Sequence, residues 1–466
     1  MYLKNNKNIC QYNLAYPNCI IEIVMRQKIS DNRTNLMRYE IREIVDVIQK
    51  IQELDKDFKV DNENIGDPVA KGWPVPPFLK DLLIEAIKEE GDKVFGYSHS
   101  RGWPPARKWV CKYSKRFAPS SDLDYEYVLF TSGLGAAISA IYEMLPHGLR
   151  IIQPTPSYPT HASMESFNAR DESIGYELDP ENKWEPNLAD LEEKIKNNQK
   201  IVGILVINPN NPTGAVYSKE TLEKIIKLAE KYNLFIVADE VYFRMIYNGY
   251  TFTHITELAH NRVPLMVMRG VSKDVPWPGG RCGWIEFHNI NLDEDYRKYC
   301  DAIKKRILLE VCSTSLPQMI LEKLYDHPDF DRWIAEYNAR LEDNSKNISR
   351  ILSASPYLKV NQTNGAFYMM PLFKEGVLNN RQTLPIKNHD VKKFIEELTA
   401  NPNMPLDKRF VYYLLAATGI CVVPATSFFS KHYGFRLTTL ERNPLKRDEI
   451  YTRVEKAIRE YAESSR

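Results

Sequence analysis

Groups that can do chemistry follow four short apolar runs in the middle of this 466-residue chain. The run at 127–130 leads into Thr-Ser-Gly-Leu-Gly-Ala at 131–136, and the run at 201–208 leads into Asn-Pro-Asn-Asn-Pro-Thr-Gly at 208–214. The runs at 233–240 and 263–270 lead to Asp239 with Tyr242, and to Ser272, Lys273 and Arg281. An amine, a carboxylate, hydroxyl and amide donors and a guanidinium are the groups that an aldehyde cofactor requires.

Pyridoxal 5′-phosphate fits this set of groups. It needs a lysine amine for its Schiff base, an acidic partner for its pyridine nitrogen, donors for its ring oxygen, and cationic and backbone donors for its phosphate. Each group also has an ordinary explanation: the Asn-Pro segment as a tight turn, Asp239 as a helix cap, Lys273 as a solvated lysine, and Arg281 in a surface ion pair. These explanations are sound one at a time, but together they are hard to sustain.

The glycines at 133 and 135 first suggest a dinucleotide-binding turn. That interpretation fails because Ile138 occupies the third position of the pattern, where glycine or alanine is required for close packing of helix and strand. The free backbone N–H groups at a helix start still favour a phosphate site, although such a loop is weak evidence by itself.

The elements that must position these groups alternate along the chain. Between about 80 and 290, helical segments separate six apolar runs, at 127–130, 149–154, 201–208, 233–240, 263–270 and 282–287. Ser218 is placed to cap one of the helices between them. Continuous apolar strands separated by helices predict a mostly parallel sheet covered on both faces, with ligands at the carboxyl ends of its strands.

The two ends of the chain predict a smaller α+β domain. A helical pattern spans 37–54, two further apolar runs lie at 364–371 and 419–424, and a last helix carries apolar residues from Ile450 to Tyr461. We expect a poorly ordered extension at 1–35, a small domain formed by 36–79 and 321–466, and a large cofactor-binding domain at 80–320. Residues 374–410 suggest an insertion of loop and short helix.

Composition excludes several classes of protein. With 62 basic and 61 acidic residues the net charge is +1, which argues against a nucleic-acid platform. No apolar run approaches the roughly 20 residues of a membrane-spanning helix. The seven cysteines are scattered without CxxC spacing, so we expect a cytoplasmic protein without a disulfide framework or metal site, and with Cys282 and Cys421 in its core.

Taken together, the motifs resemble the fold-type I pyridoxal-phosphate-dependent aminotransferases of class I/II, over nearly all of the chain from residue 35. Asn211 precedes Asp239 by 28 residues, Tyr242 follows Asp239 by three, and Arg281 follows Lys273 by eight, as in that family. The segments IGDP, WEPNLADLEEKI, INPNNPTGAVYSKE and ADEVY are most similar to its alanine-aminotransferase-like subgroup. The resemblance implies an α/β fold, with a large domain built on a mostly parallel mixed sheet and a smaller α+β domain.

The resemblance also implies roles at the reacting centre. Lys273 corresponds to the Schiff-base lysine, which also moves a proton, and Asp239 to the partner of the pyridine nitrogen. Asn211 and Tyr242 correspond to donors to the ring oxygen, and Tyr158 to the ring that stacks on the cofactor. A tyrosine at that position would otherwise be interpreted as a core residue.

Further roles concern the two anions of the reaction. The phosphate would be bound by backbone N–H groups of Gly133 and Leu134, by Ser272 and Arg281, and by Tyr97 of the neighbouring subunit of a homodimer. Arg436 would bind the substrate carboxylate, together with Asn211 and a loop containing Gly66. Leu134 stands where many relatives have a hydroxyl or a small residue, and Gly270 where many have serine, which predicts fewer side-chain donors to the phosphate.

The predicted activity is transfer of an amino group between an L-amino acid and a 2-oxo acid. A carbon-sulfur β-lyase or another lyase of the same fold remains the alternative, because the same lysine chemistry can expel a β-substituent. A non-catalytic sensor in which the cofactor fold regulates a partner is disfavoured. Such a sensor usually needs an attached DNA-binding segment, and the first 35 residues or so are too few and not basic enough to supply one. Trp73 and the aromatic residues at 95–103 could line the substrate pocket, but packing explains them better, and the substrate stays open.

Overall fold

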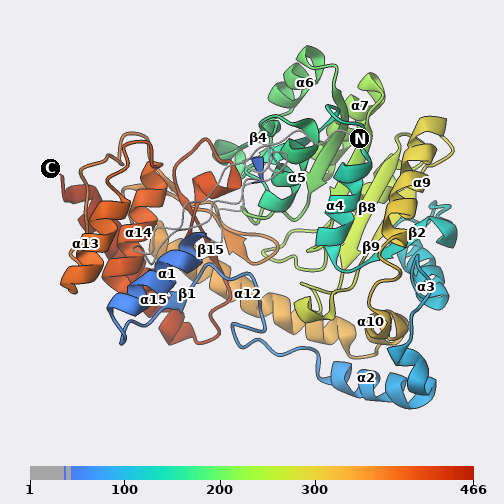
Figure 1. Cartoon of the computed structure of the whole chain (residues 1–466), viewed down its shortest axis with the longest axis horizontal. Helices are drawn as coiled ribbons and strands as arrows, with labels where there is room; N and C mark the ends of the chain where they lie inside the picture. Colours follow the sequence, from blue (N-terminus) through green and yellow to red (C-terminus); the bar gives the residue numbers. More distant parts are fainter. Residues whose placement is uncertain (1–35, 38–42, 466) are drawn as a thin grey trace, which may run out of the picture.

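The computed structural model describes residues 36–37 and 43–465, and its larger lobe is built on an eight-stranded sheet (Figure 1). The strand order is β2-β9-β8-β7-β6-β3-β4-β5. The strands are β2 (Val128–Thr131), β3 (Arg150–Thr155), β4 (Gly175–Asp179), β5 (Glu185–Pro186), β6 (Ile201–Ile207), β7 (Phe235–Asp239), β8 (Leu265–Gly270) and β9 (Gly283–His288). All six apolar runs predicted between 127 and 287 are strands of this sheet.

The direction of the strands places several loops at one edge. Strands β4, β3, β6, β7 and β8 are parallel, whereas β9 is antiparallel to both β8 and β2. Because β2 and β8 are both antiparallel to β9, they run in the same direction as each other. The segments that follow β2, β6, β7 and β8 therefore start from the same edge, and the predicted mostly parallel mixed sheet is confirmed.

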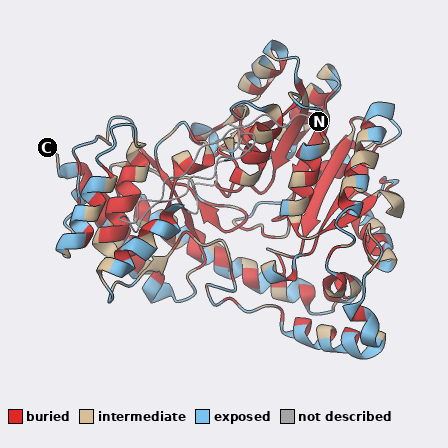
Figure 2. Cartoon of the chain, viewed as in Figure 1, coloured by how far each residue is buried: buried red, intermediate tan, exposed pale blue. Residues whose placement is uncertain are grey.

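Helices cover both faces of the sheet. One face packs against α4 (Leu134–Met144), α5 (Pro159–Ala169) and α9 (Glu294–Leu308), and the other against α6 (Leu188–Asn197), α7 (Lys219–Tyr232) and α8 (Ile255–Ala259). Alternate residues of β6 serve the two faces: Leu205 and Ile207 lie in one apolar cluster, and Ile204 and Val206 in the other. Figure 2 shows the central strands mostly buried.

The predicted cap of α7 is present. The Ser218 hydroxyl oxygen accepts a hydrogen bond from the backbone N–H of Thr221, at 3.1 Å. This bond satisfies one of the donors that a helix start leaves open, and it fixes where the helix begins.

Further helices lie beside the β2 edge and extend from it. They are α2 (Pro77–Glu90), η3 (Gly91–Phe95), α3 (Pro104–Lys115), α10 (Ser315–Met319) and α11 (Leu321–Tyr325). The long helix α12 (Phe330–Leu352) then runs to a second lobe (Figure 1). Phe330, at its first turn, packs with Trp109 of α3 in one apolar cluster, whereas Leu352, at its end, packs with α1 and α15 in another.

The second lobe combines both ends of the described chain (Figure 1). Its helices are α1 (Glu43–Leu54), α13 (His389–Leu398), α14 (Leu406–Thr418) and α15 (Pro444–Glu463). Its short strands are β1 (Asp61–Asn62), β10 (Leu358–Lys359), β11 (Tyr368–Met369), β12 (Leu372–Phe373), β13 (Ile420–Cys421), β14 (Val423–Pro424) and β15 (Phe435–Thr438). The long closing helix is confirmed as α15.

Some sequence expectations differ from the structure or lie outside it. The runs at 364–371 and 419–424 contain only two-residue strands, β11, β13 and β14. The segment 374–410 contains α13 and the start of α14, which is more helix than predicted. The extension at 1–35 and residues 38–42 lie outside the described residues, and the domain boundaries at 79 and 320 stay a prediction.

The described part also bears on cysteines and membranes. Its five cysteines are free thiols, and Cys282 and Cys421 are buried, as expected of core residues. Among the described residues, no helix combines the length and the apolar character needed to cross a bilayer.

A buried network of charged side chains connects β7, β8 and β9 near the carboxyl ends of β7 and β8. The Arg269 guanidinium donates to Glu240 at 2.6 Å and to Glu286 at 2.8 Å, and all three side chains are at most 3% exposed. Despite burial, the Arg269 cation lowers the pKa of Glu286 to about 2. Because Glu240 directly follows Asp239, this network fixes the backbone from which Asp239 projects.

Replacing Arg269 by methionine should strongly destabilise the protein. R269M leaves two carboxyl groups buried without their cation, and we expect it to lower the free energy of unfolding by about 3–5 kcal/mol. The matched control is R262M, because Arg262 also bonds two glutamates, Glu223 and Glu230, but nearer the surface. Its loss should cost at most about 1 kcal/mol. Urea unfolding of the cofactor-free protein measures both, and equal losses would contradict this account.

Candidate active site

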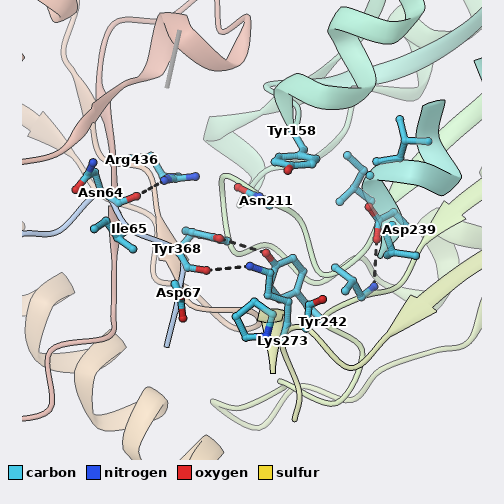
Figure 3. A pocket seen from close by; sticks show the side chains of 18 of the residues that line it. Asn64, Ile65, Asp67, Tyr158, Asn211, Asp239, Tyr242, Lys273, Tyr368 and Arg436 are labelled. Atoms are coloured by element: carbon cyan, nitrogen blue, oxygen red, sulfur yellow. Dashed lines mark hydrogen bonds between the residues drawn. The ribbon is translucent and has the colours of Figure 1, made fainter. Parts of the chain in front are cut away.

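A cavity of about 450 Å³ lies at the carboxyl edge of the sheet, where the two lobes meet (Figure 3). The large sheet contributes residues that follow β2, β6, β7 and β8, and the second lobe contributes the loop after β1, Tyr368 of β11 and Arg436 of β15. The predicted site residues that line this cavity are Gly66, Leu134, Tyr158, Asn211, Asp239, Tyr242, Ser272, Lys273, Arg281 and Arg436.

Lys273 projects into the cavity from the loop after β8. Its amine donates a hydrogen bond to the carbonyl oxygen of Gly66 at 2.9 Å, so the two lobes touch at this point. The amine also lies 5.7 Å from the centre of the Phe367 ring. A primary amine at the centre of a partly buried cavity is placed to bond covalently to an aldehyde.

Asp239 ends β7 and is 5% exposed. One carboxylate oxygen accepts from the backbone N–H of Val241 at 3.2 Å, and the other lies 3.4 Å from Nε2 of His161. These contacts orient the carboxylate at the edge of the sheet. His161 lies on α5 three residues after Tyr158, a helical spacing that could have indicated it, but the sequence analysis missed this residue.

Two hydroxyl groups meet on the other side of the cavity. The Tyr242 hydroxyl donates to the Tyr368 hydroxyl at 3.2 Å (Figure 3). Burial, reinforced by the neighbouring Tyr368, raises the pKa of Tyr242 well above its ordinary value. Tyr242 therefore keeps its proton at neutral pH and can act as a hydrogen-bond donor. Sequence reasoning missed Tyr368 as well.

The turn after β2 forms a cradle for an anion. Gly133 has φ +78° and precedes α4, whose first backbone N–H groups are at the positive end of the helix. The Arg281 guanidinium lies directly against Gly133. A Cβ atom at position 133 would therefore fall only 2.3 Å from Nη2 of Arg281. Arg281 also donates to the carbonyl oxygens of Ser132 and Pro278, each at 3.1 Å.

Arg436 forms the second cationic position. Its Nη2 donates to the carbonyl oxygen of Asn64 at 2.6 Å (Figure 3). The guanidinium lies 4.5 Å from the centre of the Tyr368 ring and 4.8 Å from that of Phe428. A planar cation fixed in this way suits bidentate binding of a carboxylate.

Two predicted residues do not line the cavity. Gly133 is one position before its wall at Leu134, and it contacts Arg281 as described above. Tyr97 follows η3 at the surface and is 85% exposed, so it has no contact with the cavity of its own chain. Its expected role in a neighbouring subunit stays a prediction.

The residues present fit pyridoxal 5′-phosphate. The buried side-chain oxygen of Asn211 has no hydrogen-bond partner among the described residues, and an orphaned acceptor of this kind is costly unless a donor from a ligand or solvent reaches it. The cradle at Gly133 and Arg281 suits a phosphate, Asp239 suits a ring nitrogen, and Lys273 suits the aldehyde. In the part of the chain that the structure describes, no group of His, Cys, Asp and Glu side chains could bind a metal ion instead.

A second buried carboxyl group directly follows Lys273. Asp274 is 1% exposed and accepts from the Tyr325 hydroxyl at 3.1 and 3.2 Å. Burial raises the pKa of Asp274 to about 7, although the nearby Arg244 cation and the Tyr325 bond oppose this shift. Arg244 uses its Nε to donate to the Tyr113 hydroxyl, at 2.7 Å.

Replacing Gly133 by alanine should weaken cofactor binding. The new methyl group would displace Arg281, and a side chain at positive φ adds backbone strain, so G133A should bind pyridoxal phosphate about tenfold or more weakly. G148A is the matched control, since Gly148 also has a positive φ (+86°), does not line the cavity, and would place a Cβ atom with no atom within 4 Å. Titration of the cofactor-free protein gives both dissociation constants. Equal affinities for G133A and G148A would show that this cradle does not bind the phosphate.

Replacing Asp274 by asparagine should change how stability depends on pH. An acid whose pKa is about 7 when folded and about 4 when unfolded stabilises the protein less as pH rises between these values. From pH 5 to pH 8, D274N should therefore gain stability relative to the wild type, by about 2.5 kcal/mol. Thermal unfolding of the cofactor-free protein across this range measures the trend. The exposed Asp122 gives a control, D122N, and a D274N curve parallel to the wild type would refute the assignment.

Comparisons with known proteins match one family over most of the chain. A family model described as aminotransferase class I and II matches residues 71–447. An uncharacterized aminotransferase of Methanocaldococcus jannaschii is 42% identical over 437 residues, 94% of this chain and 99% of the relative. A glutamate-pyruvate aminotransferase of Haemophilus influenzae is 27% identical, covering 81% of this chain and 85% of the relative.

A solved structure extends the agreement to the fold. An alanine aminotransferase from Pyrococcus furiosus is 28% identical, has a TM-score of 0.78, and covers 92% of this chain and 100% of that chain. The predicted resemblance, fold class and cofactor are thereby confirmed. The chain belongs to the class I and II aminotransferases, which are pyridoxal-phosphate-dependent enzymes of fold type I.

Proposed function

We propose that the cavity around Lys273 transfers an amino group between an L-amino acid and a 2-oxo acid. The observation that supports this most directly is that Lys273, Asp239 and Arg436 line one cavity. An amine, a carboxylate and a guanidinium then face the three groups that the reaction must bind: the aldehyde, the ring nitrogen and the substrate carboxylate.

Each residue has a separate task in this proposal. The cofactor would supply an aldehyde carbon that accepts the amino group and a ring that withdraws electrons from the substrate α-carbon. The Lys273 amine would then move a proton between the substrate α-carbon and that carbon of the cofactor. Asp239 keeps the ring nitrogen protonated, while Tyr242 and Asn211 donate to the ring oxygen. Tyr158 stacks on the ring, and Ser272, Arg281 and the backbone at Gly133 and Leu134 bind the phosphate.

The substrate carboxylate would bind at Arg436, with Asn211 and the Gly66 loop beside it. Arg436 and Gly66 belong to the second lobe, whereas Asn211 follows β6 of the sheet. Binding of the carboxylate would therefore draw on both lobes and place the α-carbon near Lys273.

Assembly and compartment extend the proposal. We infer a homodimer in which Tyr97 reaches the phosphate of the partner subunit, and the 80% exposure of Phe95 and 85% exposure of Tyr97 support an apolar contact there. A cytoplasmic enzyme of amino acid metabolism is supported by the free thiols in the described residues. The relatives above are all named as aminotransferases, which favours transamination over the lyase alternative.

Replacing Lys273 by alanine tests the proposed chemistry. K273A should lose transamination by at least about a hundredfold, because no other amine replaces its proton transfer, while its thermal unfolding should stay close to that of the wild type. It should also lose the visible absorbance of the cofactor-loaded protein. K305A, which removes an exposed lysine of α9, is the control. A K273A enzyme with the full rate would contradict the proposal.

A substrate panel would then define the reaction. Alanine and glutamate, with pyruvate and 2-oxoglutarate as acceptors, come first because two relatives are named for them, and tyrosine and aspartate extend the range. Ammonia and pyruvate released from cysteine without a 2-oxo acid acceptor would instead favour the lyase.

A further inference from the structure

Tyr368 contacts three of the residues to which the proposed function gives tasks. It belongs to β11, is 3% exposed, and lies in the second lobe, while Tyr242 belongs to the segment after β7. Its hydroxyl accepts from Tyr242, its ring packs on the Arg436 guanidinium, and its hydroxyl lies against the backbone of Gly66. One side chain thus joins the substrate-carboxylate position to the donor of the cofactor ring oxygen.

The ring of Tyr368 restrains the Arg436 guanidinium. With its centre 4.5 Å from the guanidinium carbon, the ring is within the range of a cation–π contact. Arg436 is 4% exposed, so this contact is shielded from water and stronger than it would be at the surface. The contact limits rotation of the guanidinium, so that it faces an incoming carboxylate in one orientation.

The hydroxyl of Tyr368 completes a chain of hydrogen bonds. A phenol has one proton to donate but can also accept. When Tyr242 turns its proton to the ring oxygen of the cofactor, the Tyr368 hydroxyl can rotate and donate to the Tyr242 oxygen across the same 3.2 Å. A donor that itself accepts a hydrogen bond is a stronger donor, so Tyr368 would increase the stabilisation of negative charge on the ring oxygen.

The backbone of Gly66 packs closely against the Tyr368 hydroxyl. A Cβ atom at position 66 would lie 2.1 Å from the Tyr368 hydroxyl oxygen, and 3.0 Å from the ring carbon that bears it. The Tyr368 hydroxyl therefore obstructs a side chain at position 66 more than the ring does. The loop that contains Gly66 also contains Asn64, whose carbonyl oxygen accepts from Arg436, so the hydroxyl contacts the loop that helps to hold Arg436.

We propose that Tyr368 is a positioning residue with two separable parts, a ring that orients Arg436 for the substrate carboxylate and a hydroxyl that strengthens Tyr242 as a donor to the cofactor. This inference rests on the proposed function, since it assigns Tyr368 a task toward the same cofactor and substrate.

Two substitutions separate the two parts. In Y368F the ring remains, so the affinity of the cofactor-loaded protein for a carboxylate should stay within about twofold of the wild type. In Y368L both parts are lost, and affinity should fall about five- to thirtyfold, as expected for loss of a buried cation–π contact. The probe is whichever of propanoate, 3-phenylpropanoate and glutarate binds the wild type best, measured by calorimetry.

The hydroxyl has a spectroscopic readout. In both variants the pH midpoint of the visible absorbance should rise, because a weaker donor at the ring oxygen makes the linkage to Lys273 more basic. Y247F is the matched control, since Tyr247 is also buried and its hydroxyl bonds to the carbonyl oxygens of Gly365 and Ala366, just before Tyr368. Y247F should change neither the midpoint nor the carboxylate affinity.

A double-mutant cycle tests the contact with Gly66. G66A should weaken carboxylate binding in the wild-type background, and at least about threefold less in the Y368F background, where the hydroxyl that obstructs the new methyl group is gone. Additive effects would overturn the placement of the hydroxyl.

The remaining outcomes are distinct. An unchanged midpoint in Y368F, unchanged affinity in Y368L, or the same changes in Y247F would overturn the positioning role and leave the proposed function intact. If K273A kept the pH-dependent visible absorbance of the wild type, the proposed function would be overturned, and this inference with it.

Discussion

The parallel pairing of β7 with β8 is the constraint on which the site depends. In this register Asp239 lies opposite Met268, so β8 continues two residues further, to Gly270, before the loop with Lys273 begins. A one-residue slip would turn the Asp239 side chain to the opposite face of the sheet. The buried bonds of Arg269 to Glu240 on one side and to Glu286 on the other oppose such a slip, because any shift would leave charges unpaired in the interior.

The second constraint is that the cavity is completed by distant parts of the chain. Gly66, Tyr368 and Arg436 come from three separate segments of the second lobe, and each contacts another residue of the site. The bond from Lys273 to the Gly66 carbonyl and that from Tyr242 to Tyr368 both cross between the lobes. Relative movement of the lobes would therefore alter the carboxylate position and the cofactor position together.

Sequence reasoning was most successful where local chemistry decides structure. The six apolar runs formed strands and Ser218 capped its helix, since strand burial and helix capping depend on adjacent residues. The residues that follow the parallel strands could also be placed together, because parallel strands end on the same side of the sheet.

Contacts across the fold were not predictable in this way. His161 was missed because its value depends on packing against Asp239, 78 positions away. Tyr368 was missed because residues 366–370 are a continuous apolar run, which does not show which side chain faces a cavity. The resemblance to a family identified the remaining roles, and the structure places Arg436 beside Tyr368 and Phe428, neighbours that spacing alone does not reveal.

The arginines show how the same side chain serves structure in one place and ligand binding in another. Arg269 is buried between two glutamates whose charges oppose its own, and this pairing raises its pKa further above its ordinary value despite burial. The positive charge of Arg269 is therefore balanced within the fold by Glu240 and Glu286. Arg281 donates instead to the carbonyl oxygens of Ser132 and Pro278, which orient the guanidinium but bring no net charge. Its positive charge therefore remains available at the cradle beside Gly133, where an anion at the start of α4 would gain both from the cation and from the backbone N–H groups of the helix.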